Sequence, residues 1–113
     1  MHFSRNGEFF SVSRITGPHH NLLQIRLSKG DADATALECL PAIGSCTHPP
    51  LDSDKLLVAV LEGIAKANLE LGTAYWAAHV RYVGNDTPPE SVYGFLALSI
   101  VRHLESGGTF VEV

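Results

Sequence analysis

Hydrophobic and polar residues alternate along much of the first third of the chain, which is the pattern of half-buried strands. Residues 8–16 place Phe10 and Val12 on one side of a strand, and residues 23–28 alternate in the same way. The turn-forming run 17–21 between them predicts a hairpin with a loop of about five residues. His19 and His20 are therefore expected at the hairpin tip, and residues 35–40 form a third strand that ends at Pro41.

The spacing of apolar residues changes from two to that of a helix after residue 52. Asp52 or Ser53 is expected to cap this helix, and Gly72 suits its exit. Gly63 inside the helix costs about 1 kcal/mol relative to alanine, and we attribute its presence to close packing on a sheet. The helical pattern is formed by Leu56, Leu57, Val60, Leu61, Ile64, Ala67, Asn68 and Leu71.

Residues 75–83 predict a fourth strand, and a second helix follows it. One face of this strand is expected to carry Trp76, Ala78, Val80 and Tyr82. The run 87–90 (Thr-Pro-Pro-Glu) predicts a capping box, with Thr87 at the N-cap and Glu90 at N3. The helix is expected to end at Gly107, with a last short strand over 109–113. We interpret Phe95 and Leu98 on this helix as core residues rather than a contact surface.

The predicted order is β-β-β-α-β-α-β, which favours an α+β two-layer sandwich with a mixed sheet and both helices on one face. The chain has 113 residues, a length typical of one domain, so we treat 1–113 as a single domain. A domain of this size can bury a core without a disulfide or metal.

Charge argues against two classes of partner. The formal net charge is −4, and the 8 Lys and Arg residues are scattered singly. Nucleic-acid and membrane-surface binding both favour clustered basic residues, so both are disfavoured. The sequence contains no signal-peptide pattern and no apolar run long enough to span a membrane. We therefore expect a cytoplasmic protein in which Cys39 and Cys46 are reduced.

No local motif predicts a catalytic residue, a cofactor or a metal site. Cys39, Cys46 and His48 do not have the spacing of zinc modules, and we interpret the cysteines as a buried strand thiol and a loop thiol. A thiol triad of Cys46, a distant histidine and Asp86 has no supporting signature. A small metal- or thiol-dependent enzyme nevertheless stays open as an alternative. His79 and His103 are interpreted as structural.

Three segments carry a family resemblance. They are Ala59-Val60-Leu61-Glu62-Gly63-Ile64, the strand His79-Val80-Arg81-Tyr82-Val83, and the helix start running from Asp86 to Ala97. Together they resemble domain IV of the elongation factor G family. The resemblance implies the ribosomal protein S5 domain 2-like fold, whose left-handed crossover departs from the usual right-handed rule.

In that family, loops at one end of the domain reach the decoding region of the ribosome. The matching positions are the 16–21 turn and the 84–89 loop, so we take His19, His20, Asn85 and Asp86 as candidate binding residues. The family's first loop is glycine-rich and basic, whereas residues 17–21 contain no Lys or Arg. The GTPase module of the family has no counterpart in the chain.

Our leading hypothesis is a non-enzymatic domain that binds a macromolecular partner, by preference a protein. The acidic charge and the exposed edges of a small sheet favour this reading. A homodimer would cover such an edge. The alternative is a translation-related factor that contacts the ribosome or RNA.

Overall fold

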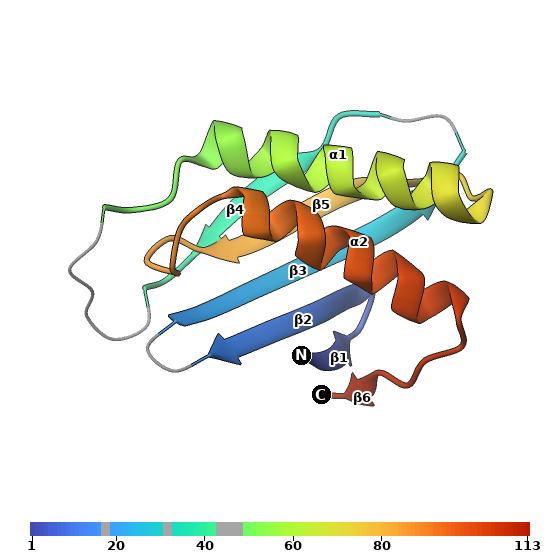
Figure 1. Cartoon of the computed structure of the whole chain (residues 1–113), viewed down its shortest axis with the longest axis horizontal. Helices are drawn as coiled ribbons and strands as arrows, with labels where there is room; N and C mark the ends of the chain where they lie inside the picture. The colour runs from blue at the N-terminus through green and yellow to red at the C-terminus, as the bar shows by residue number, and fades with distance from the viewer. Residues whose placement is uncertain (17–18, 31–32, 43–48) are drawn as a thin grey trace.

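The computed structural model describes residues 1–16, 19–30, 33–42 and 49–113. Two helices pack on one face of a six-stranded mixed sheet with the order β4-β5-β3-β2-β1-β6, as Figure 1 shows. The predicted α+β class, the two layers and the placement of both helices on one face are confirmed. The elements are β1 His2–Asn6, β2 Phe9–Thr16, β3 His19–Lys29, β4 Ala36–Leu40, α1 Ser53–Leu71, β5 Tyr75–Val83, α2 Ser91–Glu105 and β6 Val111–Glu112.

The prediction of the first third was incomplete in two places. β1 was missed, because Phe3 is the only large apolar residue in its five positions. It forms through its partners, since it pairs antiparallel with β2 and parallel with β6. The expected five-residue hairpin loop is also wrong. β3 already begins at His19, and its pairing with β2 makes His20 and Asn21 strand residues.

A bulge in β5 changes which residues face the helices. Arg26 of β3 pairs with His79, but the next residue, Leu27, pairs with Ala77, so Ala78 is an extra residue. Ala77 lies in the core together with Val80. The prediction that Trp76 and Ala78 share a face with Val80 and Tyr82 is therefore wrong. The extra residue at the bulge exchanges the two faces for the part of β5 that precedes it.

The connection from β4 through α1 to β5 is left-handed. β4 and β5 are adjacent and parallel. In Figure 1 both strands point to the left, β4 lies above β5, and α1 runs in front of the sheet. When the strands are turned to point upward with the helix toward the viewer, β5 lies to the left of β4. Almost all connections of this kind have the opposite hand.

Both predicted ends of α1 are confirmed. The Asp52 carboxylate accepts hydrogen bonds from the backbone N–H groups of Asp54 and Lys55, at 3.0 and 3.1 Å. Gly72 takes the left-handed conformation with φ 67°, which glycine adopts without a steric penalty. The helix buries Leu56, Val60, Gly63, Ile64 and Ala67.

Gly63 packs against the second helix and not against the sheet, which corrects our interpretation of it. A Cβ at Gly63 would meet the carbonyl oxygen of Gly94, and a Cβ at Gly94 would lie 2.7 Å from the carbonyl oxygen of Ala59. Neither helix can carry a side chain at this point. The two glycines thus allow the backbones of α1 and α2 to touch.

The predicted capping box at the start of α2 is wrong. The helix begins at Ser91, and the side chain of Glu90 forms no cap hydrogen bond. Thr87 is already engaged, since its hydroxyl accepts a hydrogen bond from the His20 backbone N–H. The peptide bond between Pro88 and Pro89 is cis. Residues 87–90 therefore form a loop that leads into the helix rather than its first turn.

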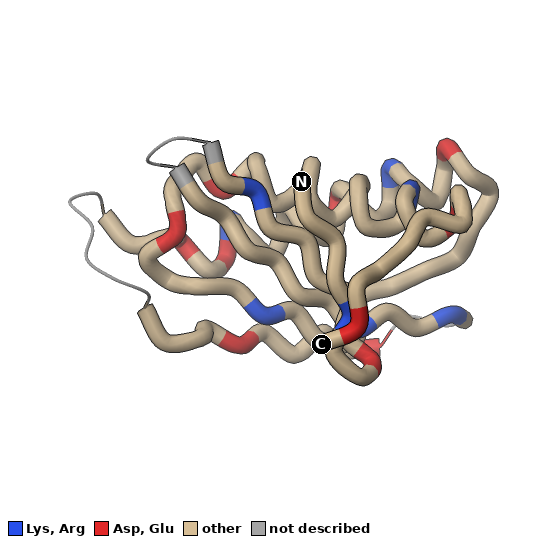
Figure 2. Tube along the Cα trace, turned by 90° about the horizontal axis from the view of Figure 1, so that it is seen from below, with Lys and Arg blue, Asp and Glu red and all other residues tan. Residues whose placement is uncertain are grey.

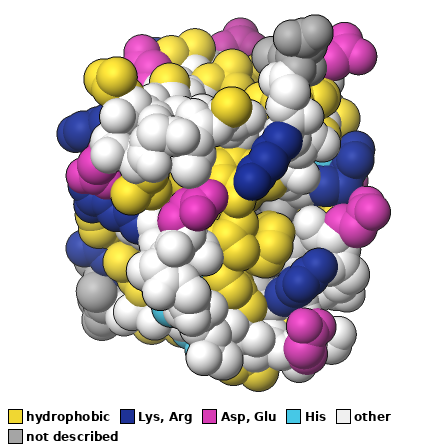
Figure 3. Space-filling view, turned by 90° about the vertical axis from the view of Figure 1, so that its right-hand side faces the viewer, with side chains coloured by type: hydrophobic (Ala, Val, Ile, Leu, Met, Phe, Trp, Pro, Cys, Tyr) yellow, Lys and Arg dark blue, Asp and Glu magenta, His cyan; other side chains and the backbone are white. Residues whose placement is uncertain are grey.

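The core is partly open at the end where both helices terminate. Figure 3 shows apolar side chains crossing this end between basic and acidic ones. The partly buried Phe10 and Leu27 line a hollow of about 220 Å³ there, together with Arg5 and Arg26. At the same end, the ring of His103 in α2 stacks on the ring of Phe3 in β1, with 3.9 Å between the ring centroids.

Two remaining expectations about α2 have opposite outcomes. Leu98 is buried, as expected for a core residue, but Phe95 is 46% exposed.

No helix in the described parts of the chain is long and apolar enough to cross a membrane.

The glycine contact leads to a first prediction. Gly63→Ala should lower the free energy of unfolding by about 1–3 kcal/mol or more, because the added methyl group meets backbone that cannot move aside cheaply. Chemical denaturation measures this change. Gly72→Ala is the control: nothing surrounds its Cβ position, and only its positive φ is unfavourable, so it should cost about 1 kcal/mol. An unchanged stability for Gly63→Ala would contradict the close contact.

Candidate functional site

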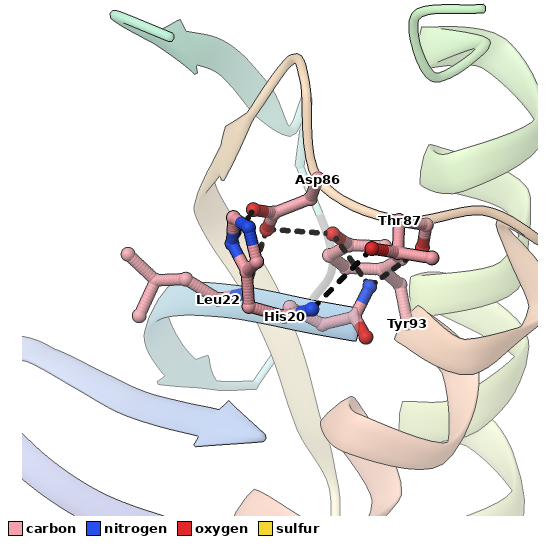
Figure 4. Close-up of polar contacts among 6 residues, drawn as sticks. His20, Leu22, Asp86, Thr87 and Tyr93 are labelled. Carbon is pink, nitrogen blue, oxygen red and sulfur yellow. Dashed lines mark hydrogen bonds and ion pairs between the residues drawn. The ribbon is translucent and has the colours of Figure 1, made fainter. Parts of the chain in front are cut away.

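A buried carboxylate lies where the loop after β5 meets the start of β3. Asp86 is 2% exposed, although it sits in the loop between β5 and α2. Its backbone N–H donates to the carbonyl of Val83, which closes a tight turn over Gly84 and Asn85. This turn directs the Asp86 side chain back toward β3, as Figure 4 shows.

Asp86 is held by groups from two other elements. Its Oδ2 accepts hydrogen bonds from the backbone N–H of Leu22, at 2.7 Å, and from the hydroxyl of Tyr93, at 2.8 Å. A buried carboxylate needs such donors, because removing its charge from water costs free energy that only charge-assisted bonds offset. The carboxylate therefore ties the 84–90 loop to β3 and α2 together.

A second set of bonds joins the same loop to β3. The side-chain amide of Asn21 donates to the carbonyl of Thr87 at 2.7 Å and to the Tyr93 hydroxyl at 3.3 Å. The backbones of His20 and Thr87 are also joined, with the Thr87 N–H donating to the His20 carbonyl at 3.2 Å. We call His20, Asn21, Leu22, Asp86, Thr87 and Tyr93 the Asp86 cluster.

Tyr93 is the most deeply placed member of the Asp86 cluster and is fully buried in α2. Burial, with the neighbouring Asp86 carboxylate, raises the pKa of Tyr93 above its ordinary value of 10.0. Its hydroxyl therefore keeps its proton at neutral pH and acts as a donor to Asp86.

His20 is the member of the Asp86 cluster that reaches solvent. Its Nδ1 lies 3.7 Å from Asp86 Oδ1, while 46% of its side chain is exposed. A carboxylate beside one ring nitrogen orients an imidazole and leaves the other nitrogen for an external group. The arrangement is suited to hydrogen bonding with a partner.

The structure brings two of the four candidate binding residues together. His20 and Asp86 are in contact, although 66 positions separate them in the sequence. Asn85 is half-buried in the same turn as Asp86. His19 begins β3, but its side chain lies outside the described part of the structure, so its predicted role stays a prediction.

Sequence reasoning missed Asn21 and Tyr93. Asn21 was assigned to the turn, and Tyr93 was counted only as an apolar residue of the second helix. A signal for Tyr93 was available: a tyrosine on the buried stripe of a helix needs a partner for its hydroxyl. Two acidic residues precede Tyr93 closely in the sequence, Glu90 by three positions and Asp86 by seven. The structure shows that Asp86 is the partner.

The other candidate chemistry is not assembled in the described residues. Cys39 is exposed on the outermost strand, which corrects our interpretation of it as a buried thiol. Cys46 and His48 lie outside the described residues. Within the described part, no group of three potential ligands could hold a metal ion. His79 pairs with Glu38, with 2.9 Å between Nε2 and Oε1.

The sheet ends in two different edges. On one side, β6 is only two residues long. On the other side, β4 is five residues long and pairs with β5 alone among the described strands. The 84–90 loop borders this longer edge, because Gly84 packs against the Cys39 sulfur.

Basic residues do not gather around the Asp86 cluster in the described part of the chain. In Figure 2 the Lys and Arg positions of the described chain are spread along the trace, with Asp and Glu positions among them. The pairs Arg81–Glu38 and Arg102–Glu70 show that some of these charges neutralise each other. No continuous basic stripe crosses the described surface.

Removing the Tyr93 hydroxyl tests the internal role of the Asp86 cluster. Tyr93→Phe should cost about 1–3 kcal/mol of stability at neutral pH, because Asp86 loses a buried donor. Ser99→Ala is a matched control on the same helix, since its hydroxyl donates only to the Phe95 carbonyl. The control should change stability by less than about 1 kcal/mol.

The same variant makes a prediction about alkaline pH. The pKa of Tyr93 is higher in the folded state than in the unfolded state. The stability that its protonated hydroxyl contributes is therefore fully present below about pH 10, the ordinary pKa of tyrosine, and is lost as the pH rises further. Denaturation followed from pH 8 to 11 should therefore show the wild type losing more stability than Tyr93→Phe. Parallel curves would contradict the raised pKa.

Comparisons with protein-family models, with curated proteins and with solved structures found no match to this chain.

Proposed function

We propose that the domain acts by binding a protein partner. The edge of β4, which pairs only with β5 among the described strands, would receive an extended segment of that partner. An edge strand presents unpaired N–H and C=O groups, which form a template for another strand. The observation that carries the proposal is the contrast between the two edges of the sheet. β6 is too short to act as such a template, whereas β4 is long enough for several backbone hydrogen bonds.

β4 contains no lysine, no proline and no bulge that would keep other chains from its edge. Natural edges are commonly blocked by lysine, by proline within the strand, or by a bulge. β4 has the sequence Ala-Leu-Glu-Cys-Leu, with Pro41 only after its end. Its one charged residue, Glu38, is turned onto the sheet face, where it pairs with His79 and Arg81.

The Asp86 cluster supports the same function by positioning the loop beside β4. Asp86 holds the 84–90 loop against β3 and α2, and Gly84 at the start of this loop packs on Cys39. His20 adds an exposed imidazole at the same end of the sheet as the loop, where a partner can form a hydrogen bond. We assign no catalytic step to these residues.

A charge introduced on the β4 edge tests this proposal. The chain is used as bait in a lysate, at low and high salt, and captured proteins are identified by mass. A strand added to β4 should survive high salt, because backbone hydrogen bonds and apolar contacts hold it. Cys39→Lys should reduce capture of that protein at least about tenfold, since each lost 1.4 kcal/mol is a factor of ten.

Ala34→Lys is the matched control for this experiment. Ala34 is exposed like Cys39 but lies before the strand begins, so capture should stay unchanged. Equal capture by Cys39→Lys and wild type would rule out the β4 edge as the binding surface.

A second function, contact with the ribosome or RNA, is supported by the hand of the β4–α1–β5 connection. The resemblance to domain IV of elongation factor G implies the ribosomal protein S5 domain 2-like fold, which has such a left-handed crossover. The 84–90 loop and the start of β3 lie at one end of the sheet, as the resemblance would require. In this proposal His20 and Asp86 belong to the contacting surface.

Sedimentation with ribosomes separates the second function from the first. Binding should be present at about 50 mM salt and fall steeply by about 200 mM, because phosphate contacts release counterions. His20→Ala should weaken it, whereas Lys29→Ala at the other end of β3 should not. Absence of co-sedimentation at low salt would eliminate this function.

A further inference from the structure

The first helix carries an apolar stripe on the side that faces solvent. Val58 is 55% exposed, Leu61 40% and Leu69 88%. The exposed Ala65 lies between them. These positions are spaced by three, four and four residues, so they form one line along the helix. The residues that α1 buries against the sheet and α2 form a separate line on its other side.

An open hollow adjoins one end of this stripe. It has a volume of about 460 Å³ and is lined by Val58, Ala59 and Pro89, with charged residues at its rim. A second hollow of about 270 Å³ continues it along the groove between the helices, where it reaches Phe95 and Leu98. The Gly63–Gly94 contact brings the two helices together at the floor of this second hollow.

A protruding side chain lies at the other end of the stripe. Leu69 is the most exposed large apolar residue of α1. It follows Val58 by eleven positions, which is about 16 Å along a helix that rises 1.5 Å per residue. One helix thus offers a hollow near its start and an apolar projection near its end.

We propose that this stripe is the interface of a homodimer, in which α1 packs antiparallel against α1 of a second copy. A two-fold axis makes each contact occur twice, so Leu69 of each copy enters the hollow beside Val58 of the other. A projection and a hollow on the same helix are what such a symmetric contact requires. Ala65, near the centre of the stripe, lets the two helices approach closely.

The charges beside the stripe complement each other in this arrangement. Glu62 and Lys66 are four residues apart and therefore share one flank of α1. A register that sets Val58 against Leu69 of the second copy sets Glu62 opposite Ala65 of that copy. Glu62 then lies within one residue of Lys66 of the second copy, and the pair repeats across the two-fold axis.

A further charge fits the same register. Lys55, at the start of α1, comes beside the end of the second copy's α1. That end has no basic residue in its last turn, so its free carbonyl groups favour a cation. The arrangement uses the helix layer and leaves the β4 edge to a partner of the kind proposed above.

Sedimentation equilibrium over a range of protein concentrations tests the dimer. The wild type should show a concentration-dependent dimer. Leu69→Glu should raise the dissociation constant at least about tenfold, because a leucine that was buried in the interface becomes a charge. Ile15→Glu is the matched control: Ile15 is 75% exposed on β2, away from α1, and its replacement should leave the dimer unchanged.

Charge reversal supplies a second and independent readout. Glu62→Lys should weaken the dimer, and Glu62→Lys combined with Lys66→Glu should restore it. A monomeric wild type at about 1 mM, the weak end of measurable affinity, would overturn the proposal. A dimer that resists Leu69→Glu, or one that is dissociated by Cys39→Lys instead, would overturn it as well.

Discussion

The architecture depends on the contact between the backbones of α1 and α2 at Gly63 and Gly94. A side chain at either position would collide with the other helix. The close approach allows both helices to fit on one face of the sheet and to share a single core. It also sets where Tyr93, one residue before Gly94, enters that core. The ion pair of Glu70 with Arg102 joins the same two helices further along.

Tyr93 links the packing of the helices to the Asp86 cluster. Its hydroxyl reaches the Asp86 carboxylate, and Asp86 in turn receives the Leu22 backbone N–H. The loop after β5 is thereby fixed against both layers of the fold. Since Gly84 of that loop packs on Cys39 of β4, the order imposed by one buried carboxylate extends to the edge of the sheet.

The parts of the fold that the sequence predicted are those with strong local signals. The spacing of apolar residues in α1, its Asp52 cap and its Gly72 exit were sufficient to place that helix. β1 escaped because its pairing partners, and not its own residues, make it a strand. The β5 bulge could not be read from alternation, because one extra residue exchanges the two faces.

Among the candidate residues, the family resemblance placed His20 and Asp86 in one binding set but did not predict that they touch. A contact across 66 positions leaves no local pattern in the sequence. Thr87 resembled a helix cap because Thr-Pro-Pro-Glu has the composition of one. Its hydroxyl serves β3 instead, which is a tertiary contact that overrides the local signal.

Two surfaces are proposed for two partners: the β4 edge for an extended segment of another protein, and the α1 stripe for a second copy. Amide hydrogen exchange, with and without a bound protein partner, tests the central claim about the edge most directly. We expect new protection over Ala36–Leu40, where backbone hydrogen bonds would form. Protection elsewhere, with none in β4, would contradict it.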